Sequence, residues 1–136
     1  REQFTEIFED HGVDVVYSGH SHSYERSFYV NGHTGLAASF VPATHAEVNA
    51  DGSPMTGQGA QTYGQVAKNG LDDKVVYTVA GNAGQAGSTS AGYPHPVMAS
   101  SNIDLGSVVI DATRRTLTAR FIDSNGMRGD FFTKNR

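Results

Sequence analysis

The sequence predicts an α/β fold that is mostly β, with one helix at its N-terminus. Apolar residues recur at helical spacing in residues 1–11, and a short strand pattern follows them directly, as in half of an α/β unit. The second half of the chain instead carries β-branched and aromatic segments that are separated by turn residues. With 136 residues, the chain suits a single domain.

Residues 1–11 are predicted to form an amphipathic helix. Gly12 is expected to end it in the left-handed conformation, with Val13 supplying the apolar contact beyond the cap. The apolar face has i, i+3, i+4, i+7 spacing and consists of Phe4, Ile7, Phe8 and His11. The acidic residues expected to face outward are Glu2, Glu6, Glu9 and Asp10. Since no capping residue precedes this helical pattern, we expect the chain to be part of a longer protein.

A strand is predicted over residues 13–17, and its nearly continuous apolar character suggests burial on both faces. The polar segment 18–27 lies at the C-terminal end of this strand, which is where open α/β sheets usually build their sites. Residues 28–30 predict a brief further strand, and Asn31-Gly32 predicts a tight primed turn after it.

Residues 34–73 lose all periodicity and are predicted to form a long loop insertion. Such a length without periodicity is uncommon inside a compact domain. Two interpretations stay open, a surface insertion and a flap over a site.

The rest of the chain is predicted to be β-rich. A strand over 74–80 is followed by a loop through Pro96, and then by an antiparallel meander with strands over 106–111, 116–122 and 128–133. In the middle strand of the meander, alternation places three apolar residues on one face, namely Leu117, Ala119 and Phe121.

Composition excludes several classes of function. The net charge is −4 and Lys and Arg form no cluster, so no nucleic-acid partner is expected. The most apolar segments, 13–16 and 75–80, each contain a polar residue and are far shorter than the roughly 18 residues of a membrane span. The absence of cysteine excludes disulfides, Cys-ligated metals and thiol nucleophiles.

The strongest chemical signal is Gly19-His20-Ser21-His22. In an extended segment, residues i and i+2 point to the same side, so His20 and His22 could bind one metal or two adjacent metals. Two imidazoles leave any such centre short of ligands, so its other ligands are expected on a segment outside this chain. The alternative is a non-catalytic β-rich binding or structural module in which both are incidental loop histidines.

The neighbouring residues Glu25 and Arg26 also allow two interpretations. Either of them could hold a metal-binding histidine in the right tautomer without binding the metal itself. Alternatively, the two could form an internal ion pair that fixes the loop. The other histidines of the polar loops are expected to be isolated and solvated; they are His33, His45 and His95.

The segment 15–27 resembles the last metal-binding motif of the calcineurin-like metallophosphoesterases, in the purple acid phosphatase-like branch. The family motif is Gly-His-x-His followed by Tyr-Glu-Arg, and both parts are present here. Supporting similarity continues in order along the chain, through residues 31–35, 76–85, 95–98 and 121–126. Residues 1–136 thus resemble the C-terminal portion of such a catalytic domain.

The resemblance implies a four-layer αββα sandwich and hydrolysis of a phosphate ester at a binuclear centre of iron with zinc, manganese or a second iron. By the same resemblance, His22 binds the first metal and His20 the second. The family's earlier motifs, which supply the remaining ligands, are absent from this sequence. We therefore expect the missing N-terminal half of the catalytic domain as a partner and an inactive isolated fragment. Secreted or periplasmic location is also implied, and a phosphodiesterase or nucleotidase is the alternative to a monoesterase.

Overall fold

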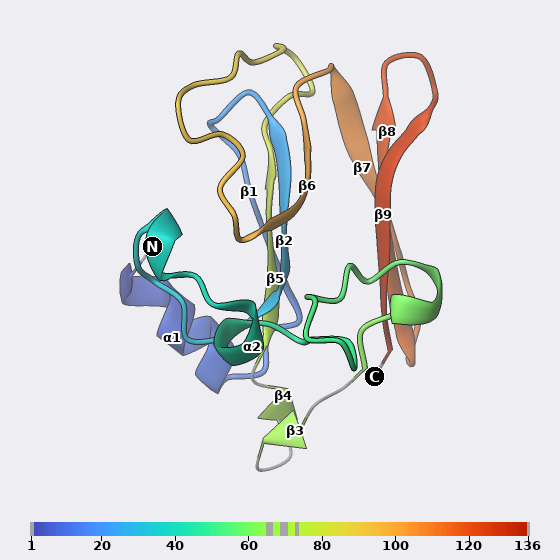
Figure 1. The fold of residues 1–136 in the computed structure, drawn as a ribbon. Coiled ribbons are helices and arrows are strands. Elements are labelled where there is room, and N and C mark those ends of the chain that lie inside the picture. Colours follow the sequence, from blue (N-terminus) through green and yellow to red (C-terminus); the bar gives the residue numbers. More distant parts are fainter. Residues whose placement is uncertain (1, 65–66, 69–70, 73, 136) are drawn as a thin grey trace.

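The computed structural model describes residues 2–64, 67–68, 71–72 and 74–135. They form two main sheets and one main helix, α1 (Glu2–Asp10) (Figure 1). The strands of the central sheet lie in the order β1 (Val15–Ser18), β5 (Val75–Ala80), β2 (Tyr24–Val30) and β6 (Met98–Asn102). The C-terminal sheet contains β7 (Gly106–Ala112), β8 (Thr116–Asp123) and β9 (Arg128–Asn135). The small remaining elements are the helix α2 (Pro42–His45), 3-10 turns at Ala37–Ser39 and Gly59–Gln61, and the pair β3 (Ala67–Lys68) and β4 (Leu71–Asp72).

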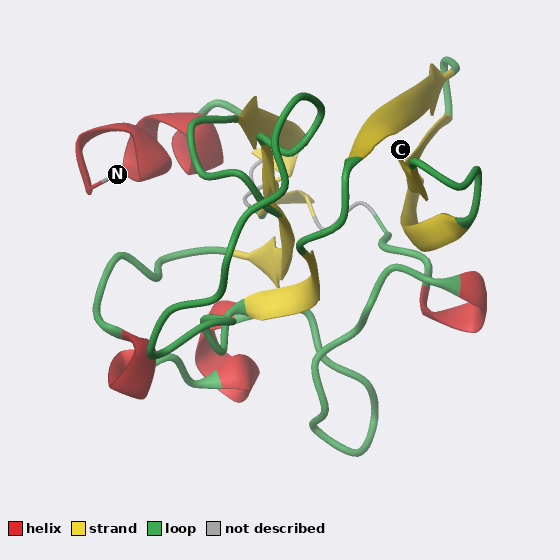
Figure 2. Cartoon of the chain, turned by 90° about the horizontal axis from the view of Figure 1, so that it is seen from above, coloured by secondary structure: helices red, strands yellow, loops and turns green. Residues whose placement is uncertain are grey.

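The two sheets pack face to face, and α1 covers the opposite face of the central sheet (Figure 2). Neighbouring residues of β5 show both contacts. Val76 is fully buried in the core between the sheets, whereas the Tyr77 hydroxyl donates to Glu9 Oε1 of α1 at 3.2 Å. The predicted fold class, mostly β with one N-terminal helix, is confirmed. Of the four layers that the resemblance implies, the described residues form three, in the order helix, sheet, sheet.

The end of α1 is as predicted, but its buried face is not. Gly12 has φ 67°, and the Val13 amide donates to the Phe8 carbonyl at 3.0 Å, which closes the helix in a Schellman arrangement. Glu9, expected to face outward, is only 6% exposed, whereas Phe4 is 59% exposed. Burial of the carboxylate is possible because it accepts hydrogen bonds from Tyr77 and from the Gly32 amide, at 2.9 Å.

Two further strand predictions need correction. β1 is half-buried and pairs in parallel with β5 at one edge of the described sheet, rather than being buried on both faces. β2 begins at Tyr24, within the segment predicted as polar loop, because it is paired on both sides, by β5 and by β6. Gly32 has a positive φ of 71°, but no hairpin follows: Val30 next bridges to Ala46, after α2.

The predicted insertion 34–73 includes residues 65, 66, 69, 70 and 73, which lie outside the described residues. Its described part contributes to the core. Tyr63 is fully buried and stacks on Tyr29 with ring centroids 5.0 Å apart. Gly57 allows this, since its φ is 74° and a Cβ there would lie 2.5 Å from the Tyr63 ring.

The predicted antiparallel meander is confirmed. β8 pairs with β7 and β9 over its length, and Ala119 and Phe121 are buried on the face predicted for them. Strand β6 was not predicted, because its residues carry little apolar character. No helix in the described ranges is long and apolar enough to cross a membrane.

Candidate functional site

The histidine-bearing loop, residues 19–22, connects the C-terminal end of β1 to β2. His20 and His22 are both exposed. His20 has a φ of 77°, an uncommon conformation for a residue other than glycine and one that costs on the order of 1 kcal/mol or more. The expectation of an extended segment is therefore wrong at His20, and the argument that i and i+2 share one side does not apply. Strained backbone of this kind is concentrated at functional sites.

The connection between β5 and β6 supports this loop by backbone contact at two glycines. A Cβ on Gly81 would lie 1.9 Å from the Ser21 carbonyl oxygen, and a Cβ on Gly87 would lie 2.2 Å from that of His22. The Gly81 amide also donates to the Ser23 carbonyl at 3.1 Å. Sequence analysis missed these two positions. The available signal was the glycine-rich segment after β5, because strands β1 and β5 are parallel and their C-terminal ends meet at one edge.

Substitution of Gly81 by Ala is expected to displace the histidine loop. The new methyl group overlaps a backbone atom, so we expect a loss of roughly 1–3 kcal/mol in unfolding free energy. Gly84→Ala is the matched control, because nothing lies within 4 Å of a Cβ there; its effect should stay within about 0.5 kcal/mol. Urea unfolding of both variants measures the difference, and equal midpoints would contradict the assigned contact.

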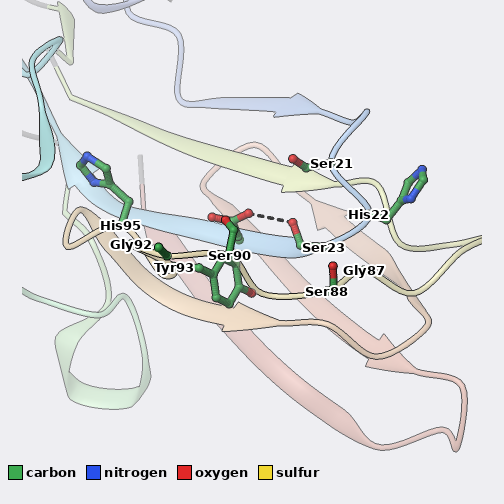
Figure 3. A pocket seen from close by; sticks show the side chains of 11 residues that line it. Ser21, His22, Ser23, Gly87, Ser88, Ser90, Gly92, Tyr93 and His95 are labelled. Atoms are coloured by element: carbon green, nitrogen blue, oxygen red, sulfur yellow. Dashed lines mark hydrogen bonds between the residues drawn. The ribbon is translucent and has the colours of Figure 1, made fainter.

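A pocket of about 420 Å³ lies beside His22. It is bounded by residues 21–25 and by the loop 87–95, which bring together hydroxyl groups, Glu25 and His95 (Figure 3). On the wall of this pocket, Ser23 Oγ donates to Glu25 Oε1 at 2.7 Å, the bond drawn as a dashed line. The polar lining suits a hydrophilic small molecule.

Arg26 points away from this pocket and into the core. Its Nε donates to Asp130 Oδ2 at 2.6 Å and its Nη2 to Asp130 Oδ1 at 3.0 Å. The expected Glu25–Arg26 ion pair is therefore wrong: the two side chains are neighbours in β2 and lie on opposite faces. Arg26 ties the two sheets together, whereas Glu25 lines the same pocket as His22, and its role toward a metal-binding histidine stays a prediction.

Buried tyrosines surround the Arg26–Asp130 pair. The Tyr24 hydroxyl donates to Asp130 Oδ2 at 2.7 Å, and Arg26 Nη1 donates to the Tyr63 hydroxyl at 3.4 Å. Burial raises the pKa of Tyr63 to about 12. Burial, followed by the charge of Asp130, also raises the pKa of Tyr24 above its ordinary value.

Alkaline pH is expected to destabilise this core. A tyrosine whose pKa is higher in the folded state stabilises the fold below about pH 10, and this contribution is lost as pH rises through the folded pKa. Between pH 10 and 12, the unfolding free energy should fall by about 1.4 kcal/mol per pH unit for each such tyrosine. Urea unfolding across this range measures how the unfolding free energy changes with pH. In Tyr63→Phe the fall should be smaller by about 1.4 kcal/mol per pH unit, the contribution of one proton. An unchanged slope in that variant would exclude Tyr63 as a contributor.

Three histidines that were expected to be isolated lie close together. The ring centroid of His33 is 5.0 Å from that of His45 and 6.0 Å from that of His95. His33 is buried, and its Nε2 lies 3.1 Å from Ser39 Oγ. The cluster forms because residues 33 and 45 flank one loop, and His95 reaches the same place from the connection before β6.

The described residues hold no group of three or more His, Asp or Glu side chains arranged for a metal ion. Asp14, an acidic residue near the motif in sequence, pairs instead with Lys134 Nζ at 2.8 Å. His20 and His22 supply imidazole nitrogens, which suit iron, zinc and manganese, and both rings are accessible. These two residues fit a part of the implied binuclear centre, and further ligands are required.

Comparison with solved structures shows the fold relationship. The chain is similar to the purple acid phosphatase PPD1 from seeds of yellow lupin (Lupinus luteus), with a TM-score of 0.71 and 19% sequence identity. The match covers all of this chain and 20% of that protein. No protein-family model and no curated protein matches the chain. The architecture is that of a part of a purple acid phosphatase-like fold.

Proposed function

We propose that the complete protein containing this chain hydrolyses phosphate esters at a binuclear metal centre, with His20 and His22 each contributing one imidazole. The observation that carries this proposal is the placement of both histidines. Both lie exposed on the loop at the C-terminal end of β1, where His20 has a strained backbone and His22 lines a polar pocket. The fold likeness to a purple acid phosphatase supports it.

In this proposal, His22 holds the first metal and His20 the second. When bound, the pair of iron with zinc, manganese or iron neutralises the charge that develops on the phosphoryl oxygens. The chain itself positions the two imidazoles through Gly81 and Gly87, whose lack of a side chain lets the loop approach the β5–β6 connection. Glu25, which lines the same pocket as His22, would orient that ring or contact the substrate.

The remaining ligands would come from outside residues 1–136, from the N-terminal half of the catalytic domain. The match to only 20% of the lupin enzyme is consistent with this arrangement. The substrate would be a phosphate monoester, or else a diester or nucleotide, and the location secreted or periplasmic. The isolated chain is proposed to be inactive, since two imidazoles leave a metal short of ligands.

Metal content and turnover of the complete protein test the proposal together. Elemental mass spectrometry after dialysis without chelator should find about two metal ions per chain. The same material should hydrolyse 4-nitrophenyl phosphate, and comparison with bis(4-nitrophenyl) phosphate separates a monoesterase from a diesterase. A protein with neither metal nor turnover would be a non-catalytic β-rich module, in which both histidines are incidental.

A further inference from the structure

The pocket beside His22 has an unusual charge composition for a protein that acts on phosphate esters. Among its lining residues, Glu25 is the carboxylate, and no Lys or Arg contributes to the wall. Four serines line the same pocket, namely Ser21, Ser23, Ser88 and Ser90. Such a wall favours cationic or hydroxylated groups of a substrate. It disfavours any phosphate group beyond the one that is hydrolysed.

The carboxylate of Glu25 accepts a hydrogen bond from a neutral donor. Its Oε1 accepts from Ser23 Oγ at 2.7 Å, and Ser23 is itself only 6% exposed. No ion pair to Glu25 occurs within the part of the chain that the structure describes. An ionised carboxylate can accept about four hydrogen bonds, so this half-buried group keeps most of its accepting capacity for a ligand.

Tyr93 contributes its ring to the wall of the pocket. Its ring lies beside the Ser23 hydrogen bond in Figure 3, between His22 at one end of the pocket and His95 at the other. Its hydroxyl is buried beside that of Ser101, a residue outside the pocket lining, so this hydroxyl is not offered to a ligand in the pocket. Burial is the main cause that raises the pKa of Tyr93; hydrogen bonding with Ser101 lowers it, and the negative charge of Glu25 raises it further.

We propose that this pocket binds a primary ammonium group, with Glu25 supplying the counter-charge and the serine hydroxyl groups of the wall accepting its remaining hydrogen bonds. Resting on the proposed function, the bound group is the alcohol portion of the substrate, which is then the phosphate ester of an amino alcohol. Binding of the free amino alcohol does not depend on catalysis. A nucleoside diphosphate or pyrophosphate would instead bring negative charge against Glu25.

Ethanolamine and 1,2-ethanediol are the matched probes, since the diol has a hydroxyl group where ethanolamine has an ammonium group. Saturation-transfer difference NMR on the complete protein, at low ionic strength, measures the affinity of each. We expect ethanolamine to bind at least about tenfold more tightly than the diol. Glu25→Gln, which keeps the size and the acceptor for Ser23, should abolish this preference.

One other variant completes the design. Asp111→Asn, a neutralisation of an exposed carboxylate on β7, should change neither affinity. Failure of ethanolamine to bind, equal binding of the diol, or an undiminished preference in Glu25→Gln would each overturn the inference.

The outcome is separable from that of the proposed function. If the complete protein hydrolyses 4-nitrophenyl phosphate and yet does not bind ethanolamine, the proposed hydrolase function is supported and the proposed amino-alcohol binding is rejected. If ethanolamine binds through Glu25 and the protein shows neither metal nor turnover, the proposed binding site is supported and the proposed hydrolase function is rejected. If both hold, O-phosphoethanolamine should be hydrolysed with a higher kcat/KM than 2-hydroxyethyl phosphate.

Discussion

Replacement of His20 or His22 by Ala in the complete protein is expected to remove one metal ion per chain and to lower kcat about 100-fold or more. Loss of an outer-shell partner already costs 10- to 100-fold at metal sites, and loss of a ligand should cost at least as much. The fold should survive, because both side chains are exposed on a loop. Elemental mass spectrometry, turnover of 4-nitrophenyl phosphate and urea unfolding measure the three effects.

His11→Ala is the matched control for these variants. His11 is also exposed, but it lies at the end of α1, where its Nδ1 is 2.8 Å from the Ile7 carbonyl oxygen. Its substitution should leave metal content and turnover unchanged. Wild-type turnover in both His20→Ala and His22→Ala would reject the assignment of the metal site.

Replacement of Asp130 by Ala is expected to cost about 3–5 kcal/mol of unfolding free energy, the largest stability effect of any single change considered. The substitution leaves the guanidinium of Arg26, which is fully buried, without its counter-charge. It also removes the acceptor of Tyr24 and of Gln58, whose Nε2 donates to Asp130 Oδ1 at 2.9 Å. Chemical denaturation followed by circular dichroism measures the loss.

An exposed pair on the C-terminal sheet provides the control. Arg120 and Asp111 are ion-paired across β8 and β7, with side chains 34% and 62% exposed. Solvent screening limits such a pair to about 0–1 kcal/mol, so Asp111→Ala should scarcely move the unfolding midpoint. Equal losses in Asp111→Ala and Asp130→Ala would contradict the idea that the buried pair joins the two sheets.

Local patterns in the sequence predicted the features that neighbouring residues determine. The turn at Gly12, the strand β5 and the meander β7–β9 depend on one glycine, on β-branched runs and on turns between alternating segments. The Gly-His-x-His motif likewise identified the loop by its residues alone. The conformation of that loop was less predictable, since the positive φ of His20 occurs where the chain packs against Gly81 and Gly87.

The sequence by itself determined the fold class, the order of the C-terminal strands and the two histidines that are proposed to bind metal, because these follow from periodicity, turn residues and side-chain chemistry within short segments. Only the tertiary structure decided that Tyr24–Ser27 belongs to a strand, that Arg26 binds Asp130 rather than Glu25, and that Glu9 is buried. Each of these depends on partners 23 or more residues away, and hydrogen bonding to such a partner outweighs the local preference of a polar residue for solvent.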